Sequence, residues 1–209
     1  MSYKFDLFVS YRHDGPYGEW VEKPFLDLFT TYLRNELGRD PIIFWDRSGI
    51  ASGDEWPLKL LSALAQSRCL IAIWSPAYFQ SEWCRKELAL MLARERHCGY
   101  RTLEKPGGLI ISVAIHDGDR FPDVAKRIQH PDWHLYARVG DGFRKTERFV
   151  EFQDKLTNWA PDVASAIAAC PKWHATFLDE QWIQAAISTI EPELQLSRVD
   201  DFFPGLEKG

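Results

Sequence analysis

The segment CLIAIWSPAYFQSEWCRKELALMLARER, residues 69–96, carries the pattern that decides the fold. Its first part, CLIAIWS (69–75), is an apolar run typical of a strand that is buried in a sheet. Pro76 follows that run, and residues 77–96 then place apolar side chains at the spacing of a long amphipathic helix. A strand that leads directly into a helix is the repeating unit of parallel sheets covered by helices.

The same unit recurs on both sides of this segment. Further strand patterns occur at residues 5–11 (FDLFVSY), 41–45 (PIIFW), 107–115 (GGLIISVAI) and 133–137 (WHLYA). Helical patterns occur at residues 25–37 (ended by Gly38), 57–67, 121–129, 146–170 (with Pro161 expected to bend or split the helix) and 179–194. Five alternations of strand and helix predict an open, mostly parallel α/β sheet with helices on both faces.

Three loops of this predicted sheet lie where ligands are expected. In open parallel sheets, ligands bind beyond the carboxyl ends of the strands, where the winding direction reverses. The loops at that edge are residues 12–18, a polar stretch with two glycines and a proline, 46–56 and 75–82. We therefore expect the chemistry of the protein in these three loops.

The composition argues against several classes of protein. A formal charge of −5 and a pI near 5.7 argue against a broad nucleic-acid-binding face. No apolar run approaches the roughly 20 residues that span a bilayer, and no signal region precedes the first strand, so we expect a cytoplasmic protein without a membrane segment. The spacing of the four cysteines, with no C-x-x-C pair, implies neither a disulfide framework nor a metal site, and Cys69 is expected in the core.

Several common catalytic motifs are missing from the sequence. No G-x-G-x-x-G follows the first strand, and the chain contains no phosphate-binding G-x-x-x-x-G-K-[ST] loop. The chain also lacks the G-x-S-x-G turn of hydrolases that carry a serine nucleophile. Any nucleotide bound here would need another arrangement to hold its phosphates.

Three stretches together resemble the TIR (Toll/interleukin-1 receptor) family. They are FDLFVSYRHD (5–14), FWDRSGIASGDEW (44–56) and LIAIWSPAYFQSEWCRKEL (70–88). They are similar to box 1, the BB loop, and the third strand with its following helix, in order and at the family's spacing. The likeness is good over 3–137 and looser over 138–170, and GDEW is closer to bacterial members.

This resemblance implies a fold and a domain division. The fold is a flavodoxin-like, doubly wound, five-stranded parallel sheet of order 2-1-3-4-5, with helices on both faces. Residues 1–170 would form the TIR domain. Residues 171–209 would be a C-terminal helical extension or the stub of a linker.

The resemblance also implies an activity. Enzymatic TIR domains cleave NAD⁺ into nicotinamide and ADP-ribose or a cyclic ADP-ribose isomer, with NAD⁺ as substrate and no cofactor. Their catalytic glutamate lies in a W-x-x-x-E motif, which here is Trp83 to Glu87. The two side chains share one helix face, so that Trp83 would stack on a ring while Glu87 meets the ribose. On spacing alone, a solvated glutamate and a tryptophan packed in the core is the simpler interpretation.

One carboxylate is sufficient for this chemistry. Loss of nicotinamide leaves an oxocarbenium-like ribose, which a carboxylate stabilises electrostatically. Hydrogen bonds from the ribose hydroxyls to the same carboxylate would hold the sugar in the reacting geometry. The cationic nicotinamide is a fair leaving group, so no general acid is required.

Two further charged residues match pocket positions of the family. Arg12 follows the first strand, where it would bind a phosphate through two parallel hydrogen bonds, or else form a surface ion pair with Asp14 or Glu19. Asp46 ends the second strand and would face the pocket, although an aspartate there also caps a turn readily.

Aromatic residues complete the predicted substrate site. Trp56 lies about where family enzymes have an aromatic residue, with the alignment shifted by one position, and helix packing is its simpler role. Tyr11, with Ser10 beside it, lines the end of the first strand and is a weaker candidate.

The family further implies partners and leaves alternative functions open. The 46–56 loop, with Gly49 and Gly53, would mediate TIR–TIR self-association, and a sensor domain or partner protein would supply the trigger. The leading hypothesis is an NAD⁺-consuming enzyme of anti-phage defence. The alternatives are a non-catalytic interaction module and a virulence factor that mimics host TIR domains. Hydrolase and cyclase are not separable, because both attack the same C1′ atom.

Overall fold

A parallel sheet forms the centre of the computed structural model, which describes residues 2–13, 16–45 and 58–196. Within these residues the sheet has four strands in the order β2-β1-β3-β4. They are β1 (Phe5–Ser10), β2 (Ile43–Phe44), β3 (Ser67–Trp74) and β4 (Ile110–Ala114). Every neighbouring pair is parallel, which confirms the predicted sheet type and the order of its first four strands.

The expected fifth strand at 133–137 does not form. A single parallel bridge joins Asp132 to Ala114, and the Trp133 N–H donates to the Ala114 carbonyl at 2.7 Å. The Asp132 carboxylate then accepts the His134 N–H at 3.0 Å. Such a side-chain-to-backbone bond closes a turn, so the chain bends away after one bridge at the position of the fifth strand.

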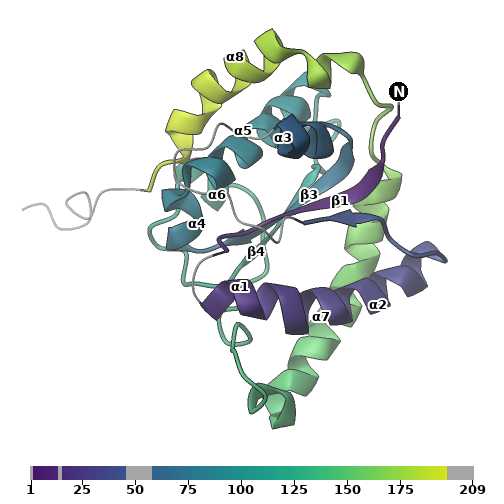
Figure 1. The fold of residues 1–209 in the computed structure, drawn as a ribbon, viewed down its shortest axis with the longest axis vertical. Helices are drawn as coiled ribbons and strands as arrows, with labels where there is room; N and C mark the ends of the chain where they lie inside the picture. Colours follow the sequence, from purple (N-terminus) through teal and green to yellow (C-terminus); the bar gives the residue numbers. More distant parts are fainter. Residues whose placement is uncertain (1, 14–15, 46–57, 197–209) are drawn as a thin grey trace, which may run out of the picture.

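Helices cover both faces of the sheet (Figure 1). One face carries α1 (Pro16–Trp20), the π-helical turn η1 (Val21–Phe25), α2 (Leu26–Leu37) and α7 (Glu147–Ala168). The other face carries α3 (Leu58–Ala65), α5 (Glu82–His97) and α8 (Glu180–Ile190). Short helices and turns connect them: α4 (Pro76–Gln80), α6 (Asp123–Lys126), η2 (Phe143–Lys145), η3 (Ala175–Leu178) and η4 (Glu191–Leu194).

The first helical stretch begins earlier than the sequence predicts. Helix α1 starts at Pro16, inside the stretch expected to be a polar loop, and continues through η1 into α2. Pro suits a first helical position, because its fixed φ matches the helix and its missing N–H is not needed there. Pro24 lies in the π-helical turn, where the wider backbone accommodates a residue that cannot donate. Gly38 ends α2 with φ 65°, as expected.

The helix predicted over 77–96 is two helices. Ser81 between α4 and α5 has an extended backbone, with ψ 117°, and its hydroxyl accepts the Cys84 N–H at 3.4 Å. Ser75 caps α4 in the same way by accepting the Tyr78 N–H at 3.2 Å. Each helix therefore begins at its own serine cap, and Ser81 divides the segment into two helices.

Pro161 neither ends nor splits α7, so the split, which was one of the two outcomes expected at this residue, is wrong, and the other, a bend, stays a prediction. The helix extends for 22 residues across it. A proline inside a helix costs about 3 kcal/mol, but α7 buries side chains on both sides of Pro161 against the core. These are Phe152, Leu156, Trp159, Ala160, Val163 and Ile167.

The C-terminal segment up to residue 196 packs on the same core. Helix α8 buries Ile183, Ala186 and Ile190 beside α5, and Leu194 of η4 is fully buried. Residues 197–209 lie outside the described part of the chain. Among the described helices, none combines the length and apolar character needed to cross a bilayer.

Asp6 connects the start of β1 to the segment before β2. Its buried carboxylate accepts two hydrogen bonds from Arg39, at 2.6 and 2.7 Å, and one from the Ile42 N–H at 2.9 Å. Burial by itself raises the pKa of Asp6, but these hydrogen bonds and the nearby positive charges outweigh it and lower the pKa below its ordinary value.

We expect Asp6→Asn to lower the free energy of unfolding by about 2 kcal/mol at pH 7, because the buried carboxylate loses its ionic hydrogen bonds with Arg39. A carboxyl with a lowered folded pKa stabilises the fold above its unfolded pKa of about 4, and this contribution disappears as the pH falls through the folded pKa. Urea unfolding at pH 7 and pH 3 should therefore show a difference that shrinks in acid. The exposed Asp154→Asn is the control, and an equal loss in both variants would contradict this role for Asp6.

Candidate functional site

The candidate site lies where the carboxyl ends of β1 and β3 meet helices α4 and α5. Strand β1 ends at Ser10, which pairs in register with Ala72 of β3. The Ser10 hydroxyl donates to Oε2 of Glu87 at 2.5 Å, and the Tyr78 hydroxyl lies 3.0 Å from Ser10 Oγ. Thus one side chain each from β1, α4 and α5 converges at this edge of the sheet.

Glu87 is a buried carboxylate, with 7% of its surface exposed. This contradicts the simpler interpretation of a solvated helix glutamate. A carboxylate is costly to bury unless hydrogen bonds satisfy it. The hydrogen bond from Ser10 meets part of that requirement and fixes the orientation of the carboxylate.

Neutral groups flank this carboxylate. The Tyr78 hydroxyl lies 3.2 Å from the Cys84 carbonyl oxygen, and the Cys84 thiol lies 3.6 Å from the Tyr11 carbonyl oxygen. Burial, with a further contribution from the negative charge of Glu87, raises the pKa of Cys84 to about 12. Burial likewise raises the pKa of Tyr78 well above its ordinary value. Both side chains therefore stay protonated at neutral pH, and Cys84 is not an activated nucleophile.

Trp83 lies one helical turn before Glu87 on α5 and is half-buried. The Lys86 ammonium lies 4.9 Å from the centroid of its ring, and Lys86 also pairs with Glu82 at 2.5 Å. The indole is therefore partly accessible and not a fully buried core residue.

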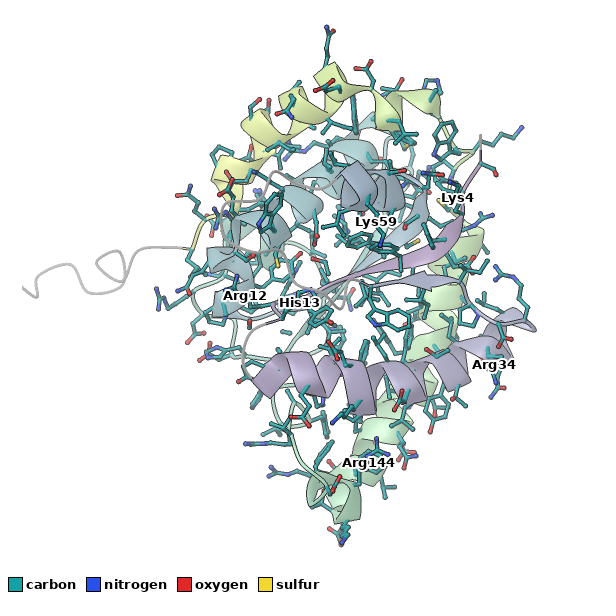
Figure 2. All side chains as sticks on the ribbon, viewed as in Figure 1. Lys4, Arg12, His13, Arg34, Lys59 and Arg144 are labelled. Atoms are coloured by element: carbon teal, nitrogen blue, oxygen red, sulfur yellow. The ribbon has the colours of Figure 1, made fainter. Side chains whose placement is uncertain are left out.

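Arg12 and His13 follow β1 at this end of the sheet (Figure 2). Arg12 is half-buried, and its positive charge opposes the rise in the pKa of Cys84 that burial causes. Tyr11 is buried, its ring centroid lies 4.2 Å from that of His13, and its hydroxyl donates to Oε1 of Glu22 at 2.9 Å. The Tyr11 hydroxyl is thus bonded to η1, and its backbone carbonyl contacts Cys84.

Two predicted site residues and the proposed association loop lie outside the described residues. These are Asp46, Trp56 and the 46–56 loop that contains both. Within the described ranges, no group of three or more His, Cys, Asp or Glu side chains is arranged to hold a metal ion.

Sequence reasoning missed Tyr78 as a neighbour of the site. The signal was its position three residues after Ser75, within the short helix that Ser75-Pro76 begins. Reading residues 77–96 as one helix concealed this, because the break at Ser81 is what makes α4 a separate element beside Ser10.

Comparisons with known proteins identify the family. A family model described as "TIR domain" matches residues 7–145. The chain is 23% identical over 201 residues to Disease resistance protein RPV1 of Vitis rotundifolia, which covers 94% of this chain and 12% of that protein. The chain therefore spans only a small part of the length of this relative.

Two solved structures are similar at low identity. The TIR domain of the Toll-related receptor TRR-2 from Hydra magnipapillata is 16% identical with a TM-score of 0.43, covering 73% of this chain and 98% of that one. The TIR domains of the activated Roq1 resistosome, which directly recognises the pathogen effector XopQ, are 18% identical with a TM-score of 0.35. The match covers 90% of this chain and 99% of that one. With a family match over residues 7–145 and a parallel sheet of the expected order, the chain belongs to the TIR domain family.

Proposed function

We propose that this TIR domain cleaves NAD⁺ at the bond between nicotinamide and ribose, with Glu87 as the catalytic residue. The observation that carries the proposal is the buried Glu87 carboxylate, held at the carboxyl edge of the sheet by the Ser10 hydroxyl at 2.5 Å. Ligands of open parallel sheets bind at this edge. A preoriented carboxylate in a desolvated site interacts strongly with positive charge that develops beside it.

In the proposed reaction, the bond between ribose C1′ and the nicotinamide nitrogen breaks. Its electron pair stays with that nitrogen, which leaves as neutral nicotinamide, and positive charge develops over C1′ and the ring oxygen. Glu87 stabilises that charge and holds the ribose hydroxyls. Water then attacks C1′ and releases a proton to give ADP-ribose, or a ring nitrogen of the adenine attacks to give a cyclic isomer.

Other residues would bind the remainder of the substrate. We assign Arg12 to the diphosphate, because a guanidinium makes two parallel hydrogen bonds to phosphate oxygens. Trp83 would stack on a ring of NAD⁺, and displacement of the Lys86 ammonium would free one face of its indole. Asp46 and Trp56 remain assigned to the pocket by the family resemblance.

We further propose that the domain acts in the cytoplasm in a defence response and that self-association through residues 46–56 activates it. The relative from Vitis rotundifolia is named a disease resistance protein, which agrees with a defence role. An anti-phage system with a separate sensor domain or partner is the specific form of this proposal. A TIR domain that only assembles and does not cut NAD⁺ is the alternative.

The test of this proposal is a concentration series. The purified chain is incubated with NAD⁺ at increasing protein concentration, and nicotinamide and the ribose product are separated by chromatography. We expect nicotinamide release per molecule to rise with concentration, with ADP-ribose indicating hydrolysis and a cyclic isomer indicating cyclisation. Self-association, measured by light scattering, without any nicotinamide release would favour the assembly-only alternative.

Ser10→Ala tests the orientation of the catalytic carboxylate. Without the Ser10 hydroxyl, the Glu87 carboxylate rotates among more conformations, and we expect kcat to fall about tenfold with a smaller change in KM. The matched control is Ser112→Ala on β4, which also removes a buried serine hydroxyl, but one without a hydrogen-bond partner in the described part of the chain. Equal activity in the two variants would contradict the positioning of Glu87 by Ser10.

A further inference from the structure

The C-terminal segment reaches the helix that carries Glu87. Helix α8 packs beside α5, and the turn η4 that follows it is anchored by Ile190 and Leu194, which are 3% and 0% exposed. This anchoring fixes the place of Glu191, the first residue of η4, beside the start of α5. The two regions are more than 100 residues apart in the chain, with a separation of 106 between Arg85 and Glu191.

Arg85 joins three elements at this point. Its Nε donates to the carboxylate of Glu191, and its Nη1 donates to the Phe79 carbonyl oxygen at 2.7 Å. The Arg85 side chain is 14% exposed and that of Glu191 is 16% exposed, so the pair is largely shielded from water. One guanidinium thus holds the end of α4, the first turn of α5 and η4 together.

The junction that Arg85 spans is adjacent to the site. Phe79 follows Tyr78, whose hydroxyl lies against Ser10, and Arg85 precedes Glu87 by two residues in α5. The backbone at Ser81 is extended, so α4 and α5 are not one continuous helix and their relative placement depends on contacts between them. The contact from Arg85 to Phe79 is one of these.

We propose that Glu191 is a positioning residue for Glu87, a role that rests on the proposed NAD⁺ cleavage. Through Arg85, Glu191 holds the α4–α5 junction so that Tyr78, Ser10 and Glu87 keep their mutual geometry. When Glu191 is removed, the guanidinium of Arg85 loses a partner that is largely shielded from water and turns toward the solvent, and the contact with Phe79 weakens. The C-terminal segment then contributes to catalysis by holding the Glu87 carboxylate in its position relative to Ser10 and Tyr78.

The structure supplies a matched control in the same turn. Glu193 also pairs with an arginine of α5, with its carboxylate 3.4 Å from Nη2 of Arg96. That pair is exposed, at 51% for Arg96 and 44% for Glu193, and Arg96 lies at the far end of α5 from Glu87. Exposed ion pairs of this kind contribute little to the stability of the fold.

The activity test compares Glu191→Ala, Glu191→Gln and Glu193→Ala for NAD⁺ cleavage. We expect Glu191→Ala to lower kcat about tenfold with little change in KM, because a displacement of the order of 1 Å in a catalytic group lowers the rate of the chemical step. Glu191→Gln retains an acceptor oxygen for Arg85 and should recover most of the loss, while Glu193→Ala should match the wild type. Equal kcat in Glu191→Ala and Glu193→Ala would overturn the proposal.

Hydrogen exchange measured by mass spectrometry separates this proposal from that of NAD⁺ cleavage. Peptides covering residues 76–90 should exchange faster in Glu191→Ala than in the wild type, and at the wild-type rate in Glu193→Ala. If the wild type does not cleave NAD⁺ while this exchange pattern appears, the proposed reaction fails and the coupling of η4 to the Glu87 turn stands. Unchanged exchange in Glu191→Ala overturns the coupling, whatever the activity.

Discussion

Replacing Glu87 by glutamine is expected to lower the rate of nicotinamide release at least ~100-fold, since one preoriented electrostatic group contributes a factor of this size or more. Glutamine has nearly the same shape and still offers an oxygen to the Ser10 hydroxyl, so the local packing around the hydrogen bond of 2.5 Å is kept. What is lost is the negative charge that stabilises the positive ribose. The loss should appear mainly in kcat, because the charge acts on the transition state.

A control must separate this effect from misfolding. The circular dichroism spectrum and the urea midpoint of Glu87→Gln should stay close to those of the wild type, and the exposed Glu82→Gln on the same helix should retain activity. Removing a charge from a carboxylate that is 7% exposed also lowers the desolvation cost of folding, so a slight gain in stability is expected. Full activity in Glu87→Gln would exclude a catalytic role for this residue.

Replacing Glu95 by alanine is expected to produce the largest loss of stability, about 3–5 kcal/mol, since two buried backbone N–H groups lose their acceptor, at about 1–3 kcal/mol each, and the ion pair with Arg101 is also lost. The Glu95 side chain is 2% exposed and pairs with Arg101, with Nε at 2.5 Å and Nη2 at 3.0 Å. Its Oε1 also accepts the N–H groups of Leu109 and Ile110, at 2.5 and 2.8 Å, where β4 begins. The substitution therefore leaves a cation and two amide groups without this partner.

The loss is measured as the free energy of urea unfolding, against Glu36→Ala on the exposed face of α2 as the control. A surface substitution of this kind changes stability by no more than about 0.5 kcal/mol. Because the free energy of unfolding of a native protein is about 5–15 kcal/mol, the loss in Glu95→Ala would remove a large part of it. If the free energies of unfolding of the two variants differ by less than about 1 kcal/mol, the hydrogen bonds of Glu95 do not stabilise the start of β4 as proposed.

The sheet could be predicted from the sequence because its strands are largely apolar and alternate along the chain with helical patterns. Two elements differ from the sequence prediction because of single polar side chains. Ser81 divides one predicted helix into two, and Asp132 closes a turn where a fifth strand was expected. At Pro161 the helix is not split, because burial of one face of α7 outweighs the local preference of proline. In each case, a tertiary or capping contact competed with a local pattern.

The candidate site could be predicted only in part. The spacing of Trp83 and Glu87 is local and visible in the sequence, and the family resemblance gave it a chemical meaning. The Ser10–Glu87 hydrogen bond joins residues 77 apart, and the Arg85–Glu191 pair joins residues 106 apart. Such pairs depend on how the elements pack, which no periodicity in a single sequence encodes.

The most direct test of the account follows NAD⁺ itself by proton NMR in a concentrated sample of the wild-type protein. We predict that the resonances of free nicotinamide grow as those of NAD⁺ decline, and that a parallel sample of Glu87→Gln leaves NAD⁺ intact over the same time. Intact NAD⁺ in the wild-type sample, in which light scattering detects self-association, would contradict the central claim, as would equal nicotinamide release in both samples.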